Sequence, residues 1–354
     1  MEQANPRQLL NTSWTLHRLS PLHHGKDCET LLDNPAALNT YATRLRDHLT
    51  GDVLAGIHAS ATTADDDGLS KTGALMGCHW QSLSGWGALN NDDDDNTSFP
   101  GILVTLEYEN ITYKAALLAE TQTSPRPQRQ QKGSTALPLL LTRFPTALRQ
   151  TFIVFLSSNF DTYCSSLRLQ SSFLCAGLGT YIDVLHDGRA TRPSGSADLV
   201  EDVIKELQLT LSFSPLVAPA LRTLNVNVSR STLADFLHEQ PTASRGRSLR
   251  QKLRSPLIGN LTSYLETHLA MNLDLDGSNT ENQLSKQHVR LSKVACAAFV
   301  LGSEGRMKLV VHAEQGDGDA EARGGNRDHL SLRASQTLLG SVIRRAVIGD
   351  QATT

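Results

Sequence analysis

Two short runs of alternating apolar residues, joined by a tight connection, most constrain what this chain can fold into. The runs are Ile102–Tyr108 and Ile111–Leu117, and Glu109 and Asn110 separate them. Alternating β-formers on both sides of a two-residue connection are typical of an antiparallel hairpin, and Asn110 is suited to the positive φ of such a turn. The sequence therefore predicts a hairpin over residues 102–117 and antiparallel pairing in the fold.

The same patterns predict the remaining elements. Further strands are expected at residues 14–19, 53–58, 74–83, 137–141, 207–213, 221–228 and 268–275. Helices are expected at residues 35–49, 145–158, 197–206, 229–238, 256–269 and 335–348, with Gly51 ending the first. A second hairpin is expected from residues 289–300 and 307–311, residues 159–184 fit helix or strand, and the Gly/Asp-rich residues 314–328 are expected to lack regular structure.

These elements favour an α+β fold with a large curved, mainly antiparallel sheet, flanking helices and long polar loops, because the helices do not alternate strictly with strands. At 354 residues the chain can hold two domains. We expect an N-terminal half at 1–190, with hairpin 102–117 and helix 145–158. The C-terminal half at 191–354 holds a basic linker at 241–255 and closing strands at about 288–312.

Composition excludes several classes of protein. The net charge of −3 gives no global basic field, so any nucleic-acid binding must be local. The five cysteines are widely spaced without a CxxC pair, which argues against a disulfide framework and a zinc site. No apolar run approaches the ~18 residues of a membrane span, and the first residues do not show the basic and apolar regions expected of a signal peptide.

One local cluster of cations remains in the basic linker. It contains five cations and no acid, and two interpretations stay open: contacts with DNA phosphates, or a solvated linker. The five residues are Arg245, Arg247, Arg250, Lys252 and Arg254.

Catalytic and cofactor motifs are not visible in the sequence. The pair Gly177 and Gly179 lacks the third glycine of a dinucleotide fingerprint, since position 182 is Ile. Residues 68–73 have the composition of a phosphate loop but not its spacing, and His238-Glu239 lacks the second histidine of a zinc protease helix. We therefore expect no enzyme activity, no cofactor and no metal.

Two distant segments carry a family resemblance. Near the N-terminus stands Trp14–Leu22, and in mid-chain Leu137–Leu141 leads into Thr151–Asp161 and Ser165–Leu169. In this order and at this separation they resemble the CENP-L family, a subunit of the inner kinetochore, and the polar inserts are similar to those of fungal members.

The resemblance implies a non-catalytic nuclear protein of the centromere and kinetochore that serves chromosome segregation. It implies a heterodimer with a CENP-N-like partner, contact with other centromere-associated network proteins, and a basic groove around DNA. The dimerisation strands would lie at about 288–312, where an alternating strand could extend a partner sheet. The interface candidates are Met307, Leu309, Val310 and Val311. The alternatives are an independent, non-specific DNA-binding module that uses the basic linker, or an enzyme of unrecognised class.

Overall fold

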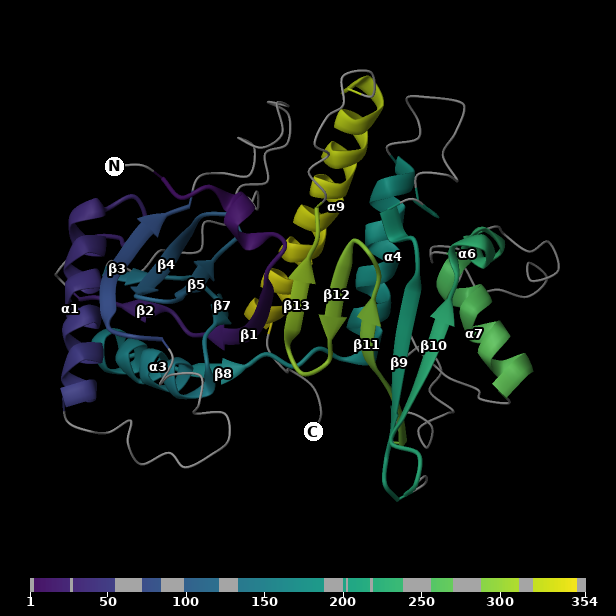
Figure 1. The fold of residues 1–354 in the computed structure, drawn as a ribbon, viewed down its shortest axis with the longest axis horizontal. Helices are drawn as coiled ribbons and strands as arrows, with labels where there is room; N and C mark the ends of the chain where they lie inside the picture. The colour runs from purple at the N-terminus through teal and green to yellow at the C-terminus, as the bar shows by residue number, and fades with distance from the viewer. Residues whose placement is uncertain are drawn as a thin grey trace. The chain divides into compact units, whose positions relative to one another are not determined.

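The computed structural model describes most of the chain in two compact units (Figure 1). Unit 1 comprises Met1–Leu9, Ser13–Leu167 and Val342–Thr354, and unit 2 comprises Leu10–Thr12 and Arg168–Ser341. The described residues are 3–25, 28–54, 72–83, 99–120, 133–187, 200–201, 203–216, 219–237, 256–269, 288–311 and 321–348.

An antiparallel sheet forms the framework of unit 1. Its strands are β1 (Ser13–Leu19), β3 (Leu75–Ser82), β4 (Gly101–Tyr108), β5 (Thr112–Leu118), β7 (Leu139–Arg143) and β8 (Cys164–Ser166). They lie in the order β8-β1-β7-β5-β4-β3, and every neighbouring pair is antiparallel. The pair β4–β5 confirms the predicted hairpin, with Glu107 opposite Thr112.

The hairpin turn differs in detail from the prediction. Asn110 does not have a positive φ. The connection between the paired residues Glu107 and Thr112 is longer than two residues, and the Tyr108 N–H donates to the Ile111 carbonyl at 3.0 Å. Longer hairpin connections are often built around a type I turn, which requires no left-handed residue at this position.

Two helices, α1 (Pro35–Leu54) and α3 (Thr146–Phe160), cover the sheet of unit 1. Gly51 does not end α1, because its φ is not positive and a helical glycine only weakens a helix. The strand expected at 53–58 is therefore wrong for residues 53 and 54, and the rest of it lies outside the described residues. Unit 1 also holds the 3₁₀ helix η1 (Pro6–Leu9) and the small pair β2 (Leu22–His23) and β6 (Ser134–Thr135).

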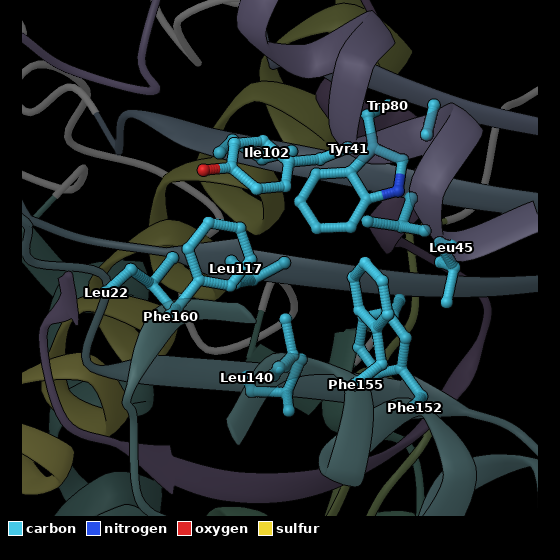
Figure 2. Packing of buried hydrophobic residues seen from close by; sticks show 14 of the residues in the cluster. Leu22, Tyr41, Leu45, Trp80, Ile102, Leu117, Leu140, Phe152, Phe155 and Phe160 are labelled. Atoms are coloured by element: carbon cyan, nitrogen blue, oxygen red, sulfur yellow. The ribbon is translucent and has the colours of Figure 1, made fainter. Parts of the chain in front are cut away.

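Aromatic side chains from these helices and strands fill the core of unit 1 (Figure 2). Tyr41 of α1 lies 4.4 Å from Phe160 of α3 between ring centroids, and Trp80 of β3 meets Phe155 edge-on at 6.4 Å. Phe152 completes the group, and all five rings are buried. Because aromatic pairs add to the free energy gained from apolar burial, this cluster fixes α1 and α3 on the sheet.

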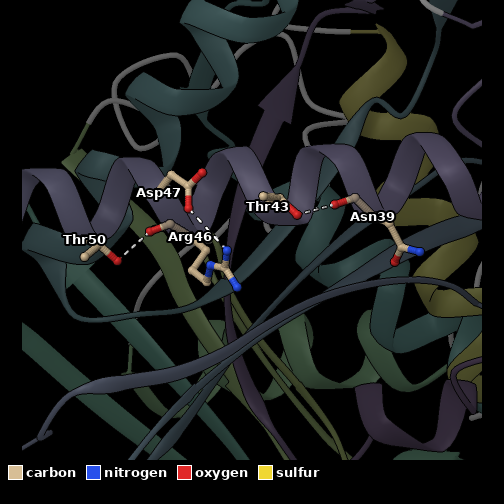
Figure 3. A network of polar contacts seen from close by, with 5 residues as sticks. All are labelled: Asn39, Thr43, Arg46, Asp47 and Thr50. Carbon is tan, nitrogen blue, oxygen red and sulfur yellow. Dashed lines mark hydrogen bonds and ion pairs between the residues drawn. The ribbon is translucent and has the colours of Figure 1, made fainter.

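The outer side of α1 is polar and forms its own hydrogen bonds (Figure 3). The hydroxyls of Thr43 and Thr50 donate to the carbonyls of Asn39 and Arg46, at 3.0 and 2.9 Å. Arg46 lies 3.5 Å from Asp47 in an exposed ion pair, which contributes little to stability. This side of α1 is an ordinary solvated helix surface.

Unit 2 contains a second antiparallel arrangement. Its strands are β9 (Leu207–Phe213), β10 (Thr223–Val228), β11 (Val289–Ala295), β12 (Phe299–Gly302) and β13 (Arg306–Leu309), in the order β10-β9-β11-β12-β13. Its helices are α4 (Ser171–Asp187), α6 (Arg230–Leu237), α7 (Pro256–Leu269) and α9 (Glu321–Ile348), whose residues from Val342 onward belong to unit 1. Tyr181 of α4 packs on Phe299 of β12 with ring centroids 5.0 Å apart.

Several sequence-based boundaries in this part of the chain are wrong. Residues 289–300 form two strands rather than one, because the chain turns at Cys296, whose N–H donates to the Phe299 carbonyl at 2.8 Å. Residues 321–328, expected to be irregular, begin α9. Residues 268 and 269 end α7, as the helix expected at 256–269 predicts, and the rest of the strand expected at 268–275 lies outside the described residues. The ambiguous residues 159–184 contain β8 and most of α4.

The α+β class with mainly antiparallel strands is confirmed. The expected domains, residues 1–190 and 191–354, would be parts of the chain that fold independently. This division stays a prediction.

Candidate functional site

The sheet of unit 2 has two unlike faces, and its strand register shows which residues share each face. Directly opposed residues of antiparallel strands project on the same side. The covered face carries only apolar side chains, and the eight at its centre are buried. They are Leu209, Leu211, Leu291, Val294, Phe299, Leu301, Met307 and Leu309.

The opposite face is polar and carries four cations. Arg290 is opposite Ser212, and Lys293 is opposite both Thr210 and Gly302. Gly302 faces Arg306 in turn, and Lys308 is opposite Val300. Arg290 and Arg306 are exposed, and Lys293 and Lys308 are half-buried. The five strands contain no acidic residue, although exposed Glu304 stands in the turn between β12 and β13.

A β-bulge at Ser292 places Lys293 on this face. Side chains three residues apart in a regular strand point to opposite sides, but the register shifts between Leu291 and Lys293. The Ser292 hydroxyl donates to the Thr210 carbonyl at 2.9 Å, and its own carbonyl accepts from the Ser303 N–H at 2.8 Å. The bulge therefore aligns Lys293 with Arg290, and the four cations form one surface, which we call the cationic sheet face.

The β10 edge of this sheet carries main-chain groups that point away from β9. Phe213 donates its N–H to the Arg222 carbonyl at 3.0 Å, and these two residues are opposite one another. Because bonded and non-bonded pairs alternate along an antiparallel ladder, the N–H and C=O groups of Thr223, Asn225 and Asn227 face outward. Among the described residues β10 pairs only with β9, so this edge can accept another strand.

The structure places the four sequence-predicted interface residues in two environments. Met307 and Leu309 are buried in the apolar face, at 2% and 1% exposure. Val310 and Val311 are half-buried beyond the end of β13. The main chain there is already bonded within unit 2, since the Asn11 N–H donates to the Leu309 carbonyl at 2.7 Å.

Asn11 also binds the main chain of Val311 through its side chain. Its Nδ2 donates to the Val311 carbonyl at 3.0 Å, and its Oδ1 accepts from the Val311 N–H at 3.1 Å. Because the main chain of Leu309 and Val311 is bonded to Asn11, a partner could contact this segment through its side chains but not by adding a strand to these groups. The five cations of the basic linker lie outside the described residues.

Groups suited to catalysis are sparse in the described part of the chain. It holds no group of three or more His, Cys, Asp or Glu residues placed for a metal ion. Burial raises the pKa of Cys78 and Cys164 to about 12 and of Cys296 to about 11, so these thiols stay protonated and unreactive at neutral pH. Of the helices described, none is both long and apolar enough to cross a membrane.

The described residues thus define an α+β protein with a cationic sheet face and an open strand edge. The sequence matches the model of the family CENP-L: Centromere protein L over residues 8–347, and the chain belongs to the CENP-L family. A comparison with curated proteins found no match. CENP-L is a structural kinetochore family, so the chain is a centromere and kinetochore protein of chromosome segregation, which implies a nuclear location.

Proposed function

We propose that this chain is a non-catalytic subunit of the inner kinetochore. In this proposal it pairs with a CENP-N-like partner through the sheet of unit 2 and contacts the DNA phosphate backbone through the cationic sheet face. The family match over residues 8–347 is the observation that carries the proposal, because it covers nearly the whole chain.

The β10 edge supports strand addition by the partner. Three outward-facing residues of β10, namely Thr223, Asn225 and Asn227, offer main-chain donors and acceptors to a partner strand. Their side chains are exposed, whereas Val228 on the other side of β10 is buried. A partner strand would thus extend the sheet without disturbing the core.

The closing segment remains a second candidate for the partner surface. Val310 and Val311 are half-buried apolar side chains at the end of β13, and a partner could cover them. Met307 and Leu309 would act indirectly, by holding β13 in place. An aspartate at Leu309 would introduce a charge into the apolar face and destabilise the chain, so Val310 and Val311 are the better positions to test.

Co-expression with a CENP-N-like subunit, followed by size-exclusion chromatography and calorimetry, tests the pairing. Asn227→Pro removes an outward N–H while preserving the ladder with β9, and Asn227→Ala is its matched control. We expect the proline variant to weaken the complex and the alanine variant to behave as wild type. Val311→Asp tests the second candidate. Unchanged binding by all three variants would place the interface elsewhere.

The cationic sheet face supports contacts with DNA. The chain as a whole has a net charge of −3, but this surface is locally positive. Its four cations are Arg290, Lys293, Arg306 and Lys308. Phosphate contacts carry no sequence information, so the binding would be non-specific and salt-dependent. The basic linker could add further phosphate contacts.

Salt titrations of the heterodimer on random and centromeric DNA separate the two sources of charge. Replacing the four sheet cations by Gln should reduce the slope of log K against log salt by up to about 3–4. Replacing the five linker cations by Ser is the parallel variant. If the heterodimer forms and neither variant alters the slope, the DNA part of the proposal fails while the pairing stands.

A further inference from the structure

A cysteine, a histidine and a threonine of unit 1 form a chain of hydrogen bonds. The Cys28 Sγ atom lies 3.3 Å from His24 Nδ1, and His24 Nε2 lies 2.9 Å from the Thr135 hydroxyl. A thiol, a base at hydrogen-bond distance and a third group that orients the base are the parts of an activated nucleophile. The thiol is therefore placed for chemistry as well as for packing.

The pairing of β2 with β6 brings these side chains together. Leu22 is opposite Thr135, and just beyond this pair the His24 N–H donates to the Gly133 carbonyl at 2.9 Å. The Leu31 N–H donates to the Thr135 hydroxyl at 3.1 Å, on the far side of Cys28 in the sequence. Both ends of the segment that contains Cys28 are thus bonded to β6, and His24 is only 5% exposed.

The hydrogen bonds of Thr135 determine where the proton of the His24 ring resides. A threonine hydroxyl offers one donor and two acceptor sites, so it can accept from Leu31 N–H and from His24 Nε2–H together. The His24 Nδ1 lone pair then faces the thiol. When the ring takes the thiol proton, both ring N–H groups keep a partner, namely the Thr135 oxygen and the Cys28 thiolate. The ion pair is therefore fully hydrogen-bonded.

The surroundings of Cys28 differ from those of three other cysteines. Burial raises the pKa of Cys78 and Cys164 to about 12 and that of Cys296 to about 11, which keeps these thiols protonated. Cys28 is half-buried, so a small reagent can approach it, and its contact is an imidazole. The described ionisable neighbours in sequence, His23 and Glu29, are exposed.

We propose that Cys28 is a reactive thiol that exchanges with small disulfides such as oxidised glutathione, with His24 as its base. The thiol proton passes to His24 Nδ1, and the Cys28 sulfur attacks one sulfur of the disulfide. A new S–S bond forms as the old one breaks, and the leaving thiolate takes the proton from the imidazolium. Cys28 is oxidised to a mixed disulfide, and one half of the glutathione disulfide is reduced to a thiol. Thr135 is a positioning residue, and the site is independent of the proposed pairing and DNA contacts.

Alkylation of the full chain by iodoacetamide, followed at each cysteine by peptide mass spectrometry, tests the activation. An isolated thiol is only about 1% ionised at pH 6.5, so assistance by a base is most visible there. Cys28 should react at least about tenfold faster than Cys164, which is half-buried against the same core. His24→Gln should slow Cys28 about tenfold at pH 6.5 and less than about twofold at pH 9.5, with His23→Gln as the matched control.

The role of Thr135 and the exchange reaction have their own measurements. Thr135→Val should slow alkylation of Cys28 roughly two- to fivefold at pH 6.5, and Thr135→Ser, which keeps the hydroxyl, should react as wild type. Incubation with oxidised glutathione should add one glutathione at Cys28 of the wild type, and Cys28→Ser should remain unmodified.

Three results would overturn the proposal. They are alkylation of Cys28 no faster than that of Cys164, the same pH dependence in wild type and His24→Gln, or no glutathione adduct at Cys28. Rapid labelling of Cys164 identifies a variant that has unfolded. If His24→Gln unfolds, the two Thr135 variants decide, and equal rates for the valine and serine variants at pH 6.5 contradict the proposal.

Discussion

His17 should make the stability of unit 1 depend on pH. This residue lies on β1, opposite Leu140 of β7 and Ser166 of β8, and only 6% of it is exposed. Its Nε2 atom has no hydrogen-bond partner among the described residues. Burial, aided by the nearby Arg149 guanidinium, lowers the pKa of His17 from 6.5 to about 4. The imidazole is therefore held neutral in the folded chain.

The pKa difference of His17 between the folded and unfolded chain sets how stability changes with pH. Between pH 6.5 and about 4 the unfolded chain binds a proton at His17 that the folded chain does not, so stability falls as pH falls. The contribution of neutral His17 to the free energy of unfolding is fully present well above pH 6.5. It decreases as the pH falls toward 4 and does not change further below that pH. The expected loss is about 2 kcal/mol between pH 7.5 and 5, and roughly 3 kcal/mol in full.

Urea unfolding, followed by tryptophan fluorescence, measures this loss, because Trp14 and Trp80 are buried in unit 1. His17→Gln removes the titrating group, and His23→Gln makes the same change at an exposed position. Between pH 7.5 and 5, the His17 variant should lose about 2 kcal/mol less than wild type, while the His23 variant should follow wild type. Identical pH dependence of wild type and His17→Gln would refute the reasoning.

Three further changes test the packing and backbone of unit 1, each by the free energy of unfolding. Phe155→Ala should lower the free energy of unfolding by about 3–5 kcal/mol, because Phe155 is buried against Trp80 and its removal leaves a cavity that the neighbouring side chains fill only in part. Asp161→Gly should stabilise by roughly 1 kcal/mol, since Asp161 ends α3 with φ 46° and ψ 45°. Gly133→Ala should destabilise by roughly 1–2 kcal/mol or more, because φ is +83° and a Cβ there would lie 2.4 Å from the Gly25 carbonyl oxygen; a neutral result would contradict this geometry.

The sequence predicted the elements whose signal is local. The hairpin 102–117, the strand β9 and the helix α7 appear where periodicity indicated them, because apolar spacing reports directly on the buried side. Proline at 35 marked the start of α1 correctly. In each case the residues of one segment decide its structure.

The errors arise where tertiary packing overrides a local signal. Gly51 indicated a helix end, but its φ is not positive and α1 runs on to Leu54, since a glycine inside a helix weakens it without ending it. Residues 289–300 gave one continuous apolar pattern, and only the turn at Cys296 divides it. For the candidate interface, alternation at Met307 and Leu309 correctly indicated a strand, although it could not show that these two side chains face the core.

The cationic sheet face could not be predicted from residue spacing, for a physical reason. Arg290 and Lys293 are three residues apart, so strict alternation puts them on opposite faces, and only the bulge at Ser292 brings them together. Arg306 and Lys308 join them through pairing of β12 with β13, which no local pattern encodes. A search for clustered charge in the sequence finds the linker at 241–255 instead, because it counts neighbours along the chain rather than across strands. Since phosphate binding depends on charges that are close in space, the proposed contact of the cationic sheet face with DNA rests on the register of β9 to β13.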